Sequence, residues 1–175
     1  MKTWKKVALA IAAAPLAFLA FATWYALHFA MDTAKPFEVN RTDARERVLI
    51  ATQGSAFKDE VVRGVVDRLG RRPAYVKVID VASLSDVREA DWNAVVVLHT
   101  WEMSKPPAAV KTFIDRAQAR DRLVVLATSG EGNQHIAGVD TITAASVMAT
   151  APAKADRIAI QVEKILAAQS PQTSR

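Results

Sequence analysis

The apolar positions of the first thirty residues form one continuous run rather than a periodic pattern. No charged residue occurs from Val7 to Ala30, and Trp4 and Trp24 lie near the two ends of this run. At 1.5 Å per residue, a helix of this length crosses a hydrocarbon core of about 30 Å, and indole rings favour its interfaces. The pattern predicts a transmembrane helix over residues 7–30 after a basic tail over residues 1–6.

A cleaved signal peptide is the competing interpretation of this run. Its apolar core is usually about 7–15 residues long and ends in small residues at a cleavage site. The present run is longer, and residues 29–34 fit such a site poorly, so we expect an uncleaved signal-anchor. Lys2, Lys5 and Lys6 favour a cytoplasmic N-terminus. The expected protein is single-pass in the cell inner membrane, with its domain on the periplasmic or outer face.

The pattern changes beyond this run. Residues 31–46 are polar, without an apolar period, as expected of a linker. Val48–Ala51 is a short apolar run closed by Gly54, which is typical of a strand buried on both faces of a parallel sheet. The next apolar residues recur at helical spacing up to Leu69, with Gly70 as the expected C-cap.

Strand and helix patterns alternate through the rest of the chain. We expect four more strands, at residues 75–81, 93–98, 123–127 and 139–143. A helix is predicted to begin at Ser104, with Pro106 and Pro107 near its first turn, and the last helix carries Ile158 and Leu166 on its apolar face. This alternation predicts an α/β domain over residues 47–168 with a doubly wound parallel sheet of about five strands. Residues 169–175 are expected to be a disordered tail.

Composition excludes several classes of function. Of the formal net charge of +5, three charges belong to the N-terminal lysines, and basic and acidic residues alternate in the remainder. We therefore expect no nucleic-acid binding, because no basic stripe is present. The absence of cysteine excludes disulfides and thiol chemistry, and three histidines make a metal enzyme improbable. No Ser-His-Asp arrangement supports a hydrolase.

The loop after the first predicted strand, residues 52–58, runs directly into a helix. Its backbone N–H groups and the helix dipole suit a phosphate. The loop lacks the spacing of a Walker motif and the three glycines of a dinucleotide fingerprint. A Gly-Ser turn that merely links strand to helix is therefore the commoner interpretation of these residues on their own.

A longer stretch of the sequence gives the loop over residues 52–58 a functional interpretation. Asp91-Trp92-Asn93 precedes a strand, His99-Thr100-Trp101 follows it, and Leu126-Ala127-Thr128-Ser129-Gly130 ends the next. This stretch resembles the middle of a flavodoxin, and the resemblance extends over nearly all of residues 47–168. It implies strand order 2-1-3-4-5, with the first strand at residues 47–52, and an FMN site at the carboxyl ends of the strands.

The resemblance assigns roles to three loops, over residues 52–58, 99–105 and 128–135. The first loop would hold the FMN phosphate, Trp101 would stack on the flavin ring, and the third loop would face its polar edge. The cofactor-binding residues so implied are Thr52, Gln53, Gly54, Ser55, Lys58, Thr100, Trp101, Glu102, Ser129, Gly130 and Glu131.

The chain also departs from the family pattern. Gln53, Ala56 and Phe57 interrupt a phosphate loop that is rich in hydroxyl groups in flavodoxins, and Lys58 stands where a threonine is expected. Two hypotheses follow. One is a membrane-anchored, FMN-binding electron-transfer protein or oxidoreductase, with a membrane redox protein or a quinone as partner. The alternative is a flavin-free flavodoxin-fold interaction or assembly module at the membrane.

Overall fold

The structure is a computed structural model that describes residues 3–29, 32–102 and 104–169. The predicted tail lies outside the described residues except for Gln169, which ends a helix, and so do residues 1–2 of the basic tail. The chain divides into two compact units, Met1–Met31 and Asp32–Arg175. Each unit is described by itself.

The first unit contains one helix, α1 (Thr3–Phe29), with Pro15 inside it. Within the described part of the chain, no helix combines the length and the apolar character needed to cross a membrane. The predicted single-pass anchor at residues 7–30 is therefore not supported. The predicted placement in the inner membrane, with the domain on its outer face, is corrected with it.

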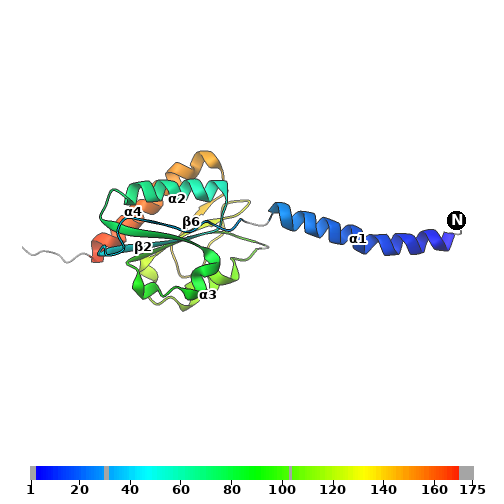
Figure 1. Ribbon diagram of the computed structural model, residues 1–175, viewed down its shortest axis with the longest axis horizontal. Helices are drawn as coiled ribbons and strands as arrows, with labels where there is room; N and C mark the ends of the chain where they lie inside the picture. Colours follow the sequence, from blue (N-terminus) through cyan, green and yellow to red (C-terminus); the bar gives the residue numbers. More distant parts are fainter. Residues whose placement is uncertain (1–2, 30–31, 103, 170–175) are drawn as a thin grey trace, which may run out of the picture. The chain divides into compact units, whose positions relative to one another are not determined.

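The second unit is built around a six-stranded sheet with strand order β1-β3-β2-β4-β5-β6 (Figure 1). All neighbouring strands from β3 to β6 pair in parallel, and β1 pairs antiparallel with β3. The strands are β1 (Phe37–Val39), β2 (Glu46–Thr52), β3 (Ala74–Asp80), β4 (Ala94–Thr100), β5 (Leu123–Thr128) and β6 (Thr141–Ala144). The α/β class and the parallel core agree with the sequence prediction, whereas the number of strands does not.

The additional strand, β1, comes from the segment predicted to be a linker. Phe37, Glu38 and Val39 pair with Val78, Lys77 and Val76 at the edge of the sheet. Only three residues form this strand, and Phe37 and Glu38 are exposed. Too few apolar positions are buried to give the sequence a recognisable period. This is why the prediction of five strands was one short.

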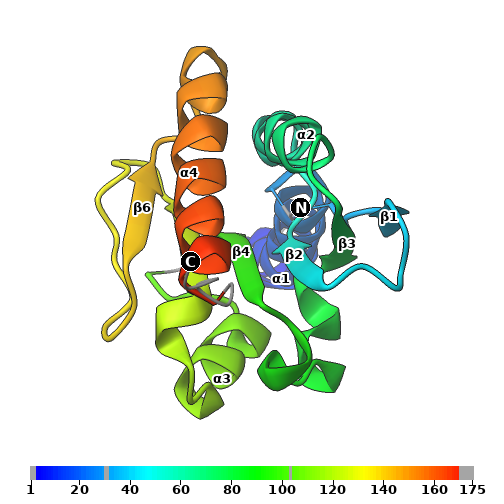
Figure 2. The same ribbon diagram turned by 90° about the vertical axis from the view of Figure 1, so that its left-hand side faces the viewer.

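Helices cover the two faces of the sheet unequally (Figure 2). The helices α2 (Ala56–Leu69) and α4 (Ala151–Gln169) lie together on one face, over a core that includes Val48, Ile50, Val96 and Leu126. The other face carries α3 (Ala108–Arg116) and the 3-10 helices η1 (Val81–Asp86) and η2 (Glu89–Asp91). Two further 3-10 helices are η3 (Arg120–Arg122) and η4 (Met148–Thr150).

The helix predicted to begin at Ser104 begins four residues later, at Ala108. Glu102 and Lys105 exchange two backbone hydrogen bonds, of 2.8 and 3.0 Å, and Ser104 has a φ of 61° inside this turn. Pro107 is still extended, at ψ 142°. The prolines therefore mark a tight turn that precedes the helix rather than the first turn of the helix itself.

The contact between α2 and α4 generates a prediction about stability. A Cβ added at Gly64 would lie 2.7 Å from the Cβ of Ala155, which is too close for two carbon atoms. Gly64→Val should therefore push the helices apart and lower the free energy of unfolding by about 1–3 kcal/mol in urea denaturation. Gly130→Val is the matched control, because no atom lies within 4 Å of its added Cβ. Equal stability of the two variants would contradict this account of the helix packing.

Candidate functional site

The candidate site lies where β2, β4 and β5 end. Each of these neighbouring strands finishes on a threonine, Thr52, Thr100 or Thr128, and Thr100 and Thr128 are paired in register. The chain leaves β2 toward β3 on one side, while β4 lies on the other side. This position is the topological switch point of the sheet, where open α/β sheets bind ligands.

The loop after β2 is shaped by the start of α2. Ser55 is the N-cap, with extended backbone at φ −168°, and its Oγ accepts a hydrogen bond from the backbone N–H of Lys58 at 3.3 Å. Thr52 is buried, and its hydroxyl donates to the Gln53 carbonyl at 3.0 Å. Both hydroxyl groups that were predicted to hold a phosphate therefore have partners within the loop.

The side chain of Lys58 turns back into the switch point and is only 1% exposed. Its Nζ donates to Thr100 Oγ1 at 2.7 Å and lies 3.4 Å from Ser55 Oγ. Thr100 Oγ1 is 2.8 Å from Thr128 Oγ1, so one chain of polar contacts joins α2, β4 and β5. Burial lowers the pKa of Lys58 to about 8, against the opposing effect of nearby carboxylates.

Gln53 joins the loop after β2 to the end of β4 and to the loop that follows β4 through hydrogen bonds. Its Oε1 accepts from the Thr100 backbone N–H at 2.6 Å, and its Nε2 donates to Glu102 Oε1 at 2.9 Å. The Gln53 backbone N–H also donates to the Leu98 carbonyl at 3.2 Å. Three polar groups of the buried Gln53 are thus bonded to β4 or to the loop that follows it.

The segment before β1 covers the same loop. The Gly54 N–H donates to the Asp32 carbonyl at 2.6 Å, and a Cβ at Gly54 would meet the Asp32 backbone at 2.6 and 2.8 Å. Ala34 is buried, and its N–H donates to Asp80 Oδ2 at 2.8 Å. Residues 32–34 therefore occupy the space beside Gly54, and this glycine is required by an approach of the chain's own backbone.

Two aromatic rings lie at the end of β4 beyond this polar cluster. His99 is fully buried, and its ring centroid lies 6.4 Å from that of Trp101. Burial lowers the pKa of His99 to about 4, opposed by a hydrogen bond to the Thr100 carbonyl and assisted by the charge of Lys58, so the ring is neutral at pH 7. Among the described residues, neither His99 Nε2 nor Trp101 Nε1 has a hydrogen-bond partner.

In the third predicted loop, the polar side chains form hydrogen bonds within the loop itself. Ser129 Oγ accepts from the Gly132 N–H at 2.9 Å, and Glu131 Oε2 accepts from Asn133 Nδ2 at 2.9 Å. Gly130 is exposed. The structure thus joins Gln53, Ser55, Lys58, Thr100 and Glu102 in one network, while the side chains of residues 129–131 bond within their own loop.

The first loop as it stands does not fit an FMN phosphate. A phosphate dianion needs free N–H and hydroxyl donors at the helix N-terminus. Here the Gly54 N–H is bonded to Asp32, and the Lys58 ammonium points inward at Thr100, so neither of these donors faces a phosphate. The carbonyl of Asp32 would also face the phosphate oxygens, which it repels.

Comparison with known proteins supports the fold. The metal-soaked flavodiiron core from Synechocystis matches with a TM-score of 0.55 and 10% identity, over 73% of this chain, which spans only 38% of that protein. An oxidoreductase from Corynebacterium diphtheriae has a TM-score of 0.48 at 13% identity, over 71% of this chain and 99% of its own. A flavodoxin from the domain Archaea has a TM-score of 0.46 at 11% identity, over 69% and 99%.

No protein-family model and no curated protein matches the sequence. The structural match to the flavodiiron core shows that the chain has a flavodoxin-like fold. An identity this low shows the fold alone.

The sequence predicted the three loops but did not reveal two of the groups that form hydrogen bonds at the site, Thr128 and Asp32. Thr128 begins the third predicted loop but was not among the predicted cofactor-binding residues, although its register opposite Thr100 follows once the sheet is known. Asp32 acts through its backbone carbonyl, which no residue pattern reveals. The predicted cofactor roles of the site residues stay predictions.

The buried ammonium of Lys58 generates a prediction about pH. Its pKa is lowered from 10.5 to about 8 in the folded chain, so between these pH values the unfolded chain binds more protons. Stability should therefore rise with pH across this window, by at most about 3 kcal/mol, and show no slope from Lys58 below pH 8. Urea unfolding of wild type and Lys58→Met from pH 7 to pH 10.5 measures the difference. A difference that stays constant with pH would contradict a buried, charged Lys58.

Proposed function

We propose that this domain is a flavodoxin-fold binding module that works without FMN. The observation that carries the proposal is the burial of the Lys58 ammonium at the switch point, where it bonds Thr100 instead of facing a ligand. A buried cation at a helix N-terminus opposes the helix dipole, so it must be held by partners within the protein. The polar network of the loops supplies these partners.

The physical argument rests on the satisfaction of polar groups. In a flavin domain the phosphate supplies the acceptors for the loop after the first strand. Here Asp32, Ser55 and Thr100 supply acceptors from the chain itself. A cofactor would have to displace these bonds and bring a phosphate dianion next to the carboxylate of Glu102, which bonds Gln53. Both changes cost free energy, which the donors released from Asp32 and Thr100 would have to offset by bonding the phosphate.

An FMN-binding redox domain is the second candidate function. The flavodoxin-like fold favours it, and so does the position of Trp101 after β4, where its indole offers a face to a planar ring. In that case flavin chemistry would be the cofactor's, with a redox protein or a quinone as partner. Residues 99–102 and 129–131 would then flank the ring.

Titration of the full chain with FMN distinguishes the two functions. We expect no saturable quenching of flavin fluorescence and no rise in the melting temperature. A ligand present at about 100 times its Kd would instead add about 2.7 kcal/mol to the stability. Circular dichroism of the same samples shows whether the α/β domain is folded.

Two variants make an opposite result interpretable. If quenching saturates in wild type, Trp101→Ala should remove it, while Trp4→Ala, outside the domain, should leave it unchanged. Ser55→Glu should also abolish binding, because it places a carboxylate at the helix N-terminus where the phosphate would lie. Saturable binding with this pattern would overturn the flavin-free proposal in favour of the FMN domain.

A further inference from the structure

A second polar feature lies on the opposite face of the sheet, where β2 begins. Arg47 is fixed there by two hydrogen bonds with Asn93, whose Oδ1 accepts from the Arg47 N–H at 2.8 Å and whose N–H donates to the Arg47 carbonyl at 2.9 Å. Its guanidinium Cζ lies 5.0 Å from the ring centroid of Trp92 and 5.6 Å from that of Tyr75. The two rings are themselves stacked, with centroids 6.0 Å apart.

This guanidinium lacks the partner that a half-buried arginine normally has. Within the described residues, Arg47 Nε is buried without a hydrogen-bond partner, and no carboxylate forms an ion pair with the group. Three nearby carboxylates pair with other cations: Glu46 with Arg72 at 3.2 Å, Asp91 with Arg88 at 2.8 Å, and Glu38 with Lys77 at 3.1 Å. The hydroxyl of Ser85 donates to Asp86 at 3.2 Å.

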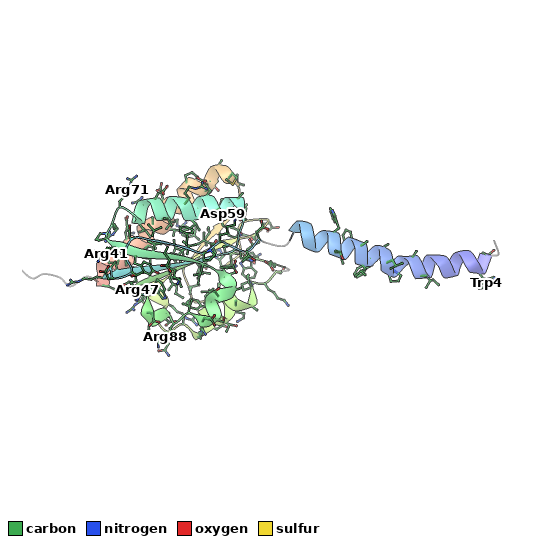
Figure 3. The ribbon with its side chains drawn as sticks, viewed as in Figure 1. Trp4, Arg41, Arg47, Asp59, Arg71 and Arg88 are labelled. Carbon is green, nitrogen blue, oxygen red and sulfur yellow. The ribbon has the colours of Figure 1, made fainter. Side chains whose placement is uncertain are left out.

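The unpaired guanidinium lines a cavity of about 440 Å³. Leu49, Ile79, Val87 and Trp92 contribute apolar surface to this cavity, and its charged lining residues besides Arg47 are Lys77, Arg88, Asp86 and Asp91. Figure 3 shows Arg47 and Arg88 on the side of the sheet that carries α3, away from Asp59 on α2. The cavity exists because 3-10 helices, rather than an α-helix, connect β3 to β4 across this face.

We propose that this cavity binds a small organic carboxylate with an apolar body, through Arg47. A guanidinium presents donors in a planar fork that matches the two oxygens of a carboxylate. The rings of Trp92 and Tyr75 pack against the guanidinium, so less rotamer freedom is lost when the ligand binds. The apolar walls accept the rest of the ligand, and the volume lies in the usual range of small-molecule sites.

This site is independent of the FMN question, because it lies at the amino end of β2 and shares no residue with the loops of residues 52–58, 99–105 and 128–135. A failed carboxylate test therefore leaves the flavin-free proposal standing, and the reverse also holds.

The test uses the full chain with benzoate as the probe, followed by NMR through the Arg47 Nε–H and the Trp92 indole signals. Benzamide has the same ring without the charge, and inorganic phosphate has the charge without the apolar body. We expect saturable shifts with benzoate and at least about tenfold weaker binding of benzamide, since hydrogen bonds between charged groups distinguish the two. Equal affinity for benzoate and benzamide would overturn the proposal. Tighter binding of phosphate would replace the apolar carboxylate by a simple oxyanion and would also overturn it.

Variants assign the site. Arg47→Lys keeps the charge but loses the planar fork, and benzoate affinity should fall about tenfold or more. Arg41→Lys is the matched control, because Arg41 is exposed and pairs with Asp43 outside the cavity. Ser83→Trp adds bulk at an exposed lining residue and leaves Arg47 unchanged, so it tests the site even if Arg47→Lys does not fold. Unchanged benzoate binding in Ser83→Trp, or in folded Arg47→Lys, contradicts the site.

Discussion

The structure depends on the pairing of β2 along both of its edges. Residues Val48–Thr52 are hydrogen-bonded to β3 on one side and to β4 on the other, and helices or 3-10 helices cover both faces. A strand enclosed in this way must be apolar along its length. Its polar continuation, from Thr52 onward, is therefore forced into the narrow space between the ends of β3 and β4, where each donor and acceptor needs a partner.

This protein meets that requirement from within. Lys58, Gln53 and the backbone of Asp32 bond to groups of the loop after β2 and of the end of β4. The result is a switch point in which a charge is buried among hydroxyl groups and a neutral histidine lies nearby. The fold is compatible with the proposed flavin-free function, because the sheet constrains where the loops meet and leaves open what fills the space between them.

The two faces of the sheet differ in how completely they are covered, and the proposed carboxylate site lies on the less covered face. The long helices α2 and α4 seal one face over an apolar core. On the other face, η1 and η2 are too short to cover the start of β2 and the middle of β3, so Arg47 remains beside a cavity. Rings of Trp92 and Tyr75 stabilise its charge in place of a carboxylate.

The sequence by itself determined the α/β class, the parallel core and the three loops at the carboxyl ends of the strands, because buried strands and amphipathic helices have periods that local residues reveal. It did not determine β1, because a short strand at the edge of the sheet leaves no clear period in the sequence. It also did not determine that α3 begins only at Ala108, or whether the apolar run of α1 spans a membrane. Only the tertiary structure decided that Lys58 turns inward, that Asp32 covers Gly54 and that Arg47 Nε is buried without a hydrogen-bond partner among the described residues. Each of these depends on contacts between residues 22 to 46 positions apart in the sequence. A local sequence pattern does not reveal such contacts.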